Sequence, residues 1–279
     1  MKFRGKLSEI SCIRQFANVI TTITKLAKVC VLRINESHLY FILTEGSGGP
    51  TVWAELAPTH FFTEFNMEGV SADKNEIYLE FQGDQLSKTL SSLKASQPQS
   101  VKMKLTKKHS PCLTFEIELM TSTGLSRSVV HDIPVSVVPR RLWSEYDEPA
   151  MPDFHVSIYL PQFKMLRTVV ERMKNLTTNI TISANREGSL SLSVETDVVS
   201  VETHFKDLGN PVVDQSAEVS SQSEFVSAMI NIKKLNHFLW GDQVNPNKVV
   251  CNVVKDKMIH LFLLHDDVSI QYFIPAVAA

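Results

Sequence analysis

Two histidine–aspartate pairs are the residues of this chain that could perform acid–base chemistry. His131 precedes Asp132 and His265 precedes Asp266, and a neighbouring carboxylate can orient an imidazole as a general base. Both pairs follow predicted strands. No nucleophile motif, phosphate-binding glycine loop or His-Glu-x-x-His motif accompanies them. We therefore expect hydrogen-bonded or surface histidines, no catalytic residue and no cofactor. The alternative is a hydrolase or ligand-binding α+β protein that uses His131 or His265.

The four cysteines form neither a metal-binding pattern nor a disulfide framework. Cys12, Cys30, Cys112 and Cys251 are scattered, and each lies in or beside an apolar periodic segment. Structural zinc sites and redox pairs need closer spacing. We predict four reduced core thiols, no metal site, and a reducing compartment such as the cytoplasm or nucleus.

Basic residues concentrate on the outward faces of four predicted helices, although the net charge of the chain is −2. Such a basic face is typical of sequence-independent contact with DNA phosphates. The alternative is an ordinary solvated helix surface. The residues predicted to point outward are Arg14, Lys25, Lys88, Lys94, Lys164, Arg167, Arg172, Lys174, Lys233 and Lys234.

These helices belong to a structural plan that occurs twice. Each half reads as a strand, a helix, several strands, a second helix and three strands. The segments 126–137 and 267–278 are both alternating strands that contain Ile-Pro, at Ile133-Pro134 and Ile274-Pro275, and matching segments are about 140 to 150 residues apart. The sequence therefore predicts a duplicated α+β fold, with helices on one face of mostly antiparallel sheets.

Several element boundaries follow from local signals. Ser8 or Ser11 could cap the first helix, Pro161 could be the first residue of the third helix, and Gly241 could end the fourth. The apolar pattern of residues 61–67 predicts a strand. Residues 210–223 have little apolar pattern and are predicted to form a mobile loop.

A proline-rich stretch, residues 132–152, joins the two halves. Its four prolines lack amide hydrogens and favour extended backbone, which makes a helix interior or a central strand unfavourable. Val135, Val137, Val138, Leu142 and Trp143 offer apolar side chains for docking. We predict a first domain at 1–133, a long extended connector at 134–152 that lies on the protein surface, and a second domain at 153–279. An ordinary proline-rich linker is the alternative.

Motifs along the whole chain indicate a known family. They include Phe65-Asn-Met-Glu-Gly-Val-Ser, Asn75-Glu-Ile-Tyr-Leu-Glu, Pro139-Arg-Arg-Leu-Trp, His204-Phe-Lys-Asp-Leu-Gly-Asn-Pro and Val268-Ser-Ile-Gln-Tyr-Phe-Ile-Pro. With these motifs the sequence resembles the Hus-type subunits of the heterotrimeric nine-one-one checkpoint clamp. These subunits are damage-response relatives of the proliferating-cell sliding clamp.

The resemblance implies a non-enzymatic subunit, one third of a pseudo-six-fold ring completed by two homologous but different subunits. It implies loading on double-stranded DNA by a clamp-loader ATPase at damaged sites, recruitment of checkpoint and repair proteins, and a nuclear location with a cytoplasmic pool. No membrane contact is expected. A homotrimeric replication clamp is the nearest alternative.

The resemblance also assigns surfaces. The helices would line the hole, so that their basic faces point at the DNA. The edge strands that pair neighbouring subunits would carry Leu113, Phe115 and Ile117 on one subunit and Val199, Val201 and Thr203 on the next. A partner-binding groove would lie beside the connector residues Ile133, Pro134, Val135, Pro139, Leu142 and Trp143.

Overall fold

The computed structural model describes residues 1–44, 50–91, 93, 97–120, 124–211 and 223–277. The chain divides into two compact units, Met1–Pro149 and Ala150–Ala279. The division follows Pro149, which lies inside the predicted connector. The two units are described separately below.

The first unit contains two antiparallel sheets that contact the helix α1 (Ile10–Leu26) through β7 and β4. The five-stranded sheet has the order β5-β1-β7-β8-β9. The other strands follow the order β10-β6-β2-β3-β4. The strands of the first sheet are β1 (Lys2–Leu7), β5 (Glu64–Glu68), β7 (Gln97–Lys107), β8 (Pro111–Met120) and β9 (Ser126–Pro134). Those of the second are β2 (Val29–Ile34), β3 (Leu39–Thr44), β4 (Pro50–Leu56), β6 (Ile77–Gln82) and β10 (Ser136–Val137).

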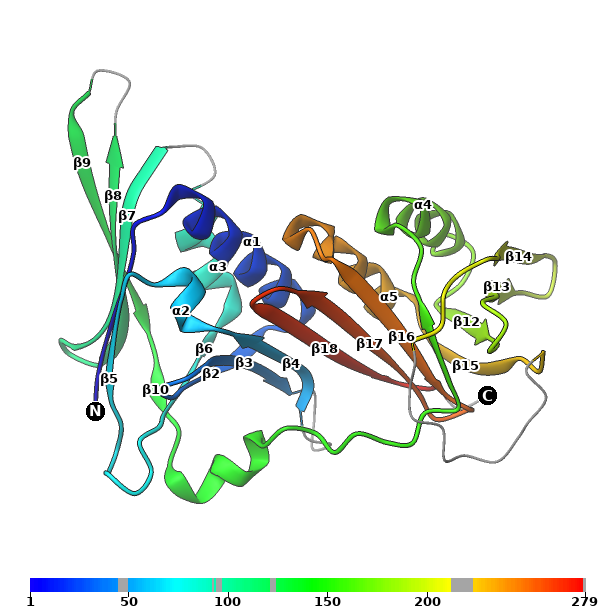
Figure 1. The fold of residues 1–279 in the computed structure, drawn as a ribbon, viewed down its shortest axis with the longest axis horizontal. Helices are drawn as coiled ribbons and strands as arrows, with labels where there is room; N and C mark the ends of the chain where they lie inside the picture. Colours follow the sequence, from blue (N-terminus) through cyan, green and yellow to red (C-terminus); the bar gives the residue numbers. More distant parts are fainter. Residues whose placement is uncertain (45–49, 92, 94–96, 121–123, 212–222, 278–279) are drawn as a thin grey trace. The chain divides into compact units, whose positions relative to one another are not determined.

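Two helices cover one face of the five-stranded sheet. α1 packs against α3 (Gly83–Ser91), and Figure 1 shows both helices on the same side of the sheet. The apolar face of α1 includes Ile13, Phe16 and Ile20, all of which are buried. These residues recur at helical spacing, so one face of the helix is apolar and its opposite face is left to solvent.

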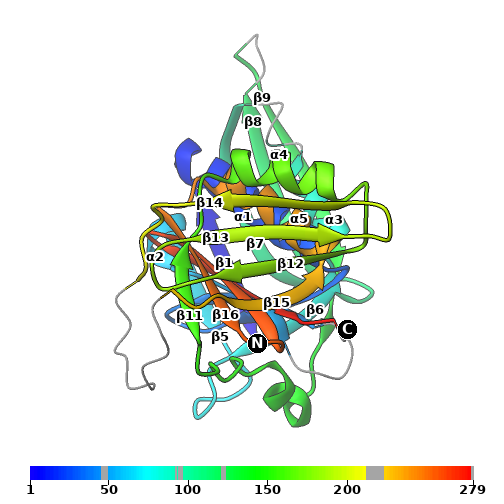
Figure 2. The same cartoon turned by 90° about the vertical axis from the view of Figure 1, so that its right-hand side faces the viewer.

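The second unit repeats this arrangement. One sheet has the order β14-β13-β12-β15 and is seen face-on in Figure 2, and the other strands follow the order β18-β17-β16-β11. The strands are β11 (Val156–Tyr159), β12 (Asn179–Ala184), β13 (Leu190–Glu195), β14 (Ser200–Phe205), β15 (Val226–Asn231), β16 (Lys248–Val254), β17 (Met258–His265) and β18 (Val268–Pro275). The helices are α4 (Phe163–Met173), α5 (Ile232–Phe238) and the 3-10 helix η2 (Leu239–Val244). The α+β prediction is confirmed.

The predicted strand at 61–67 is wrong in its first part. The chain forms the short helix α2 (Pro58–Phe61) before β5 begins at Glu64. Phe61 and Phe62 both contact the ring of Phe16 edge-to-face. Phe62 also occupies the space above Gly5, where a Cβ atom would lie 2.6 Å from its ring. Aromatic packing therefore determines the backbone conformation of residues 58–62, which an alternating pattern of apolar residues does not predict.

The predicted helix ends also differ from the structure. Glu9 is the N-cap of α1 without a side-chain capping bond, while the Ser8 hydroxyl lies 3.1 Å from that of Thr63. Gln162 precedes α4, so Pro161 is not its first residue. Beyond Gly241 the chain continues as η2 up to Val244. The predicted mobile loop falls mostly on residues 212–222, outside the described residues.

The connector docks on the first unit but is not extended throughout. Residues 140–146 form the 3-10 helix η1 (Arg140–Tyr146). Trp143 stacks on Tyr78 with ring centroids 4.4 Å apart, and its indole N–H donates to the Val138 carbonyl at 3.0 Å. The Val138 amide in turn donates to the Tyr78 carbonyl. The prediction of docked apolar side chains is confirmed. The prediction of an extended backbone is wrong for residues 140–146, because Trp143 reaches its site from a helical turn.

Candidate functional site

The basic side chains of α4 differ in whether another side chain of the second unit contacts them. Phe163, Leu166, Val170 and Met173 are buried, which leaves the opposite face to solvent. Lys164 and Arg172 are exposed there, and no ion-pair partner is found for either among the described residues. These two cations are therefore available to an external anion.

Arg167 and Lys174 are engaged within the second unit. The Arg167 guanidinium lies 5.1 Å from the centre of the Trp240 ring and 3.8 Å from an Asp242 oxygen. Lys174 donates to Glu171 at 2.8 Å. The bond from Lys174, followed by one from Asn236, holds the pKa of Glu171 below its ordinary value. Both basic residues thus contact side chains of their own unit. The Glu171–Lys174 pair agrees with three-residue spacing on α4, whereas the contacts of Arg167 with η2 do not follow from spacing along the helix.

The remaining basic candidates lie on three other helices. Arg14 on α1 and Lys233 on α5 are exposed, and within the described chain neither has an ion-pair partner. Lys88 forms an ion pair with Asp84 at 2.8 Å one turn away. Lys25 occupies the last turn of α1, where a positive charge complements the helix dipole. Lys234 is half-buried, and Lys94 lies outside the described residues.

Exposed cations give each unit a sparse basic surface: Arg14 on the helices of the first unit, and Lys164, Arg172 and Lys233 on those of the second. A surface of this kind contacts phosphates without reading bases. Ion pairs within the fold engage part of the predicted set, and contact of any of its residues with DNA stays a prediction.

The predicted edge strand of the first unit is wrong. β8 pairs with β7 on one side and with β9 on the other, so its backbone is internal to the sheet. Leu113, Phe115 and Ile117 are fully buried in the core. The edges of this sheet are β5 and β9, and β9 carries the exposed Val130. A strand with alternating apolar residues, such as β8, is typical of an internal position in a sheet.

The predicted edge strand of the second unit is confirmed as an edge. β14 pairs only with β13 in its sheet and includes Val201 and Thr203. Val199 lies just before the strand, and its amide donates to the Thr196 hydroxyl. An edge strand presents unpaired backbone groups and so provides a template for another chain. Its use as a subunit interface remains a prediction.

The connector-groove candidates are only partly accessible. Ile133, Val135 and Trp143 are buried, Leu142 is half-buried, and Pro134 and Pro139 are exposed. Beside Trp143 lies an open hollow of about 670 Å³ that the sequence did not reveal. Its lining includes Arg33, Glu76, Tyr78, Arg140 and Asp147. These residues come from separate segments, so no spacing rule could have brought them together.

Three comparisons relate this chain to known proteins. The family model described as "Hus1-like protein" matches residues 1–278. The chain belongs to the Hus1-like family. It is 48% identical to the human Checkpoint protein HUS1 over 282 residues that cover the whole of both chains. It is 28% identical to Checkpoint protein hus1 of Schizosaccharomyces pombe, which covers 90% of this chain and 88% of that protein.

The fold of this Hus1-like chain is that of a sliding clamp. The crystal structure of Proliferating Cellular Nuclear Antigen from Entamoeba histolytica matches with a TM-score of 0.72 over 99% of each chain, at 11% sequence identity. Family and fold together assign the chain to a multi-subunit checkpoint clamp of non-catalytic proteins, rather than to a homotrimeric replication clamp. The resemblance drawn from the motifs is confirmed.

In the Hus1-like chain, the aspartate of each histidine–aspartate pair accepts hydrogen bonds within the fold. Asp132 accepts hydrogen bonds from Lys108 and Thr114, which hold the pKa of its carboxyl below the ordinary value. Asp266 accepts a bond from Asn247 at 2.6 Å. The hydrolase interpretation is therefore set aside in favour of the family assignment.

The cysteines of the Hus1-like chain are buried and free. Burial raises the pKa of Cys251 to about 12 and also raises that of Cys30. These two thiols are therefore protonated and unreactive at neutral pH. Among the described residues, no group of His, Cys, Asp or Glu could hold a metal ion, and no helix has the length and apolarity to cross a bilayer.

Proposed function

We propose that this chain is one third of a heterotrimeric ring that encircles double-stranded DNA. The observation that supports the proposal is the sparse basic surface on the helices, formed by Arg14, Lys164, Arg172 and Lys233. If the helices face the hole, these cations meet phosphates at many positions along the duplex. Contacts of this kind retain DNA but leave the ring free to slide, because they carry no sequence information.

Two homologous but different subunits complete the proposed ring. β9 of the first unit and β14 of the second unit are exposed sheet edges that could pair with neighbouring subunits. A head-to-tail contact of two different edges closes into a ring when the rotation allows it. In the first unit, β9 therefore takes the place of β8 as the proposed strand for pairing with a neighbouring subunit.

Loading and signalling follow from membership of a family of checkpoint proteins. A closed ring needs a clamp-loader ATPase to open it, which here would act at damaged DNA. Once loaded, the ring would serve as a scaffold that recruits checkpoint and repair proteins. This role places the protein in the nucleus, with a cytoplasmic pool.

The double variant Lys164→Glu, Arg172→Glu is expected to weaken retention of the assembled ring on DNA. Loss of two phosphate contacts should lower the slope of log affinity against log salt by about 2, and affinity at moderate salt by about tenfold. Binding of a duplex with blocked ends, measured across a salt series, tests this. The control Lys255→Glu, Lys257→Glu makes the same charge change at a turn between two strands. A double variant that forms an intact ring with unchanged retention would refute the proposed DNA-facing surface.

Charges placed on the two edges are expected to impair assembly. Val130 on β9 and Val199 beside β14 are 54% and 38% exposed, so lysine at both positions should leave each unit folded but disfavour strand pairing between subunits. Native mass spectrometry should show a 1:1:1 complex for the wild type and free chain for the double variant. Val70→Lys, at a turn residue that is 43% exposed, is the control. Full assembly of the double variant would exclude these edges as interfaces.

A further inference from the structure

The outer face of the five-stranded sheet carries an unusual arrangement of positive charges. On the strands β1 and β7, Arg4 lies directly opposite Lys104, and Lys6 lies opposite Lys102. Residues in register on neighbouring strands project from the same face, and like charges in such pairs repel. Gly5 and Met103, which alternate with them, face the buried side. Figure 1 shows α1 on one side of this sheet. Because the alternating residues Gly5 and Met103 are buried, the two like-charged pairs lie side by side on the other face.

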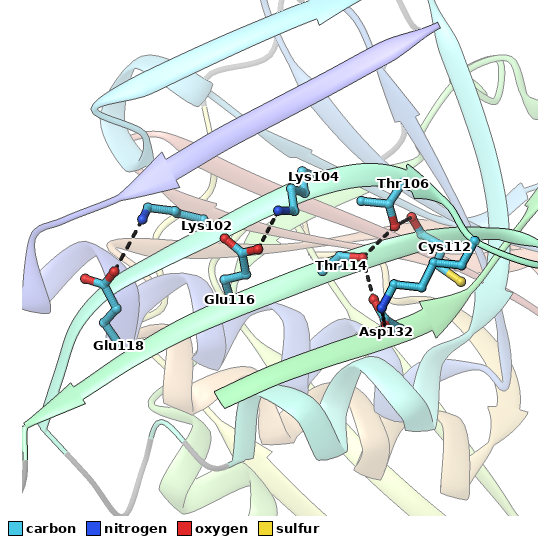
Figure 3. Close-up of polar contacts among 9 residues, drawn as sticks. Lys102, Lys104, Thr106, Cys112, Thr114, Glu116, Glu118 and Asp132 are labelled. Carbon is cyan, nitrogen blue, oxygen red and sulfur yellow. Dashed lines mark hydrogen bonds and ion pairs between the residues drawn. The ribbon is translucent and has the colours of Figure 1, made fainter. Parts of the chain in front are cut away.

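Carboxylates on the flanking strands only partly compensate these charges. Lys102 pairs with Glu118 at 3.3 Å, and Lys104 pairs with Glu116, as Figure 3 shows. On the other side, Glu64 is 3.7 Å from the nearest nitrogen of both Arg4 and Lys6. One carboxylate is therefore shared at long range between two cations. The four-cation cluster, Arg4, Lys6, Lys102 and Lys104, keeps an excess of positive charge where β1 meets β7.

The four-cation cluster is accessible and firmly held. The side chain of Arg4 is 60% exposed, and those of the three lysines are 30–37% exposed. Beside the cluster the Thr114 hydroxyl donates to Asp132 at 2.6 Å and lies 2.7 Å from the Thr106 hydroxyl (Figure 3). This hydrogen-bonded chain ties β7, β8 and β9 together, and the cations are therefore presented from a rigid sheet.

The surroundings of the cluster restrict the anion that it can accept. Acidic residues border the cluster on both sides. Glu64 on β5 and Glu116 and Glu118 on β8 pair with its cations, whereas Glu68 on β5 and Asp132 on β9 pair with Lys2 and Lys108. A continuous polyanion such as DNA would place phosphates against these carboxylates. A single, compact dianion would meet only the central cations. A phosphoryl group has the charge and the acceptor oxygens for several charge-assisted hydrogen bonds, including a bidentate one from Arg4.

We propose that this cluster binds a phosphorylated serine or threonine in an extended segment of a partner protein. The phosphoryl group lies between β1 and β7 and contacts Arg4, Lys6, Lys102 and Lys104. The flanking carboxylates exclude nucleic acid and select peptides with few other acidic residues near the phosphate. This surface is on the face away from the helices, so it is independent of the proposed DNA contact and gives the protein a docking site controlled by a kinase.

The test measures fluorescence anisotropy of a labelled Gly/Ser peptide that contains one phosphoserine, titrated with the full-length chain. The double variant Lys6→Gln, Lys102→Gln should lower the affinity about tenfold or more, because it removes two charged donors. The variant Glu116→Gln, Glu118→Gln should raise the affinity about threefold, because it removes repelling charge and frees Lys102 and Lys104. Lys28→Gln, at an exposed lysine of the same unit, is the matched control and should bind like the wild type.

One double variant is expected to weaken peptide binding and the other to strengthen it. Loss of folding could not strengthen binding, so the two results together distinguish a binding role from unfolding. Circular dichroism checks the folding of each variant independently. Three results would overturn the proposal. The unphosphorylated peptide could bind equally well, the folded wild type could fail to bind the phosphopeptide, or the glutamine variants at Glu116 and Glu118 could bind no better than wild type. A short DNA duplex that displaces the peptide and depends on the same lysines would make this face a nucleic-acid surface instead.

Discussion

Replacement of Trp143 by alanine is expected to destabilise the first unit by about 3–5 kcal/mol, the usual range for a buried tryptophan. Trp143 is only 7% exposed and packs in a cluster with Val31, Trp53 and Tyr78. Alanine would leave a cavity and remove the indole hydrogen bond to the Val138 carbonyl. Because this side chain holds η1 on the sheet, the connector should also become sensitive to proteolysis.

The measurement is urea unfolding followed by circular dichroism, together with limited proteolysis under native conditions. Trp143→Phe keeps an aromatic ring over Tyr78 and should cost about 1–2 kcal/mol less than alanine. Trp240→Ala is the matched control, because that indole is 37% exposed and should cost about 1 kcal/mol or less. A loss below about 1 kcal/mol for Trp143→Ala, with no new cleavage, would show that the connector is not anchored by this residue.

The second unit is expected to lose about 3 kcal/mol of stability between pH 6.5 and pH 4 through His260 alone. His260 is fully buried, stacks on Phe154 and contacts the tilted ring of Phe273. Its ring nitrogens lie 2.9 Å from the Asn252 amide nitrogen and 3.2 Å from the Gln271 amide oxygen. Burial lowers its pKa to about 4, although the bond to Gln271 opposes this shift. At pH values between 4 and 6.5 the unfolded chain binds a proton that the folded chain does not. Stability therefore rises with pH through this window, and it is fully present above pH 6.5.

Urea unfolding of the wild type and of His260→Phe across the window tests this. The phenylalanine variant cannot titrate at this position, so the difference in free energy of unfolding between the two proteins should shrink as the pH falls. His237→Gln is the control, since His237 is exposed. A pH dependence that is the same in wild type and His260→Phe would contradict the assignment of the acid sensitivity to this histidine.

Local patterns along the chain predicted the type of most elements and the class of the fold. The alternating and helical patterns predicted the α+β class and, in each half, the order of strands and helices that the structure shows, except for the short helix α2. The buried state of all four cysteines also followed from local apolar pattern. The duplication and the motifs were enough to indicate the checkpoint clamp family. These features depend on periodicity and residue type, both of which can be read directly from the sequence.

Which of the predicted surfaces are accessible depends on packing between segments that are far apart in the chain. Leu113, Phe115 and Ile117 proved to be core residues, because the order of strands in a sheet depends on pairing between distant segments. Arg167 was predicted to point outward from α4, but its contacts with Trp240 and Asp242 on η2 depend on packing that helix spacing does not describe. The opposition of Arg4 to Lys104 likewise depends on the register between β1 and β7, whose residues are far apart in the chain. Local periodicity fixes the face on which a side chain lies, whereas long-range pairing fixes what lies beside it.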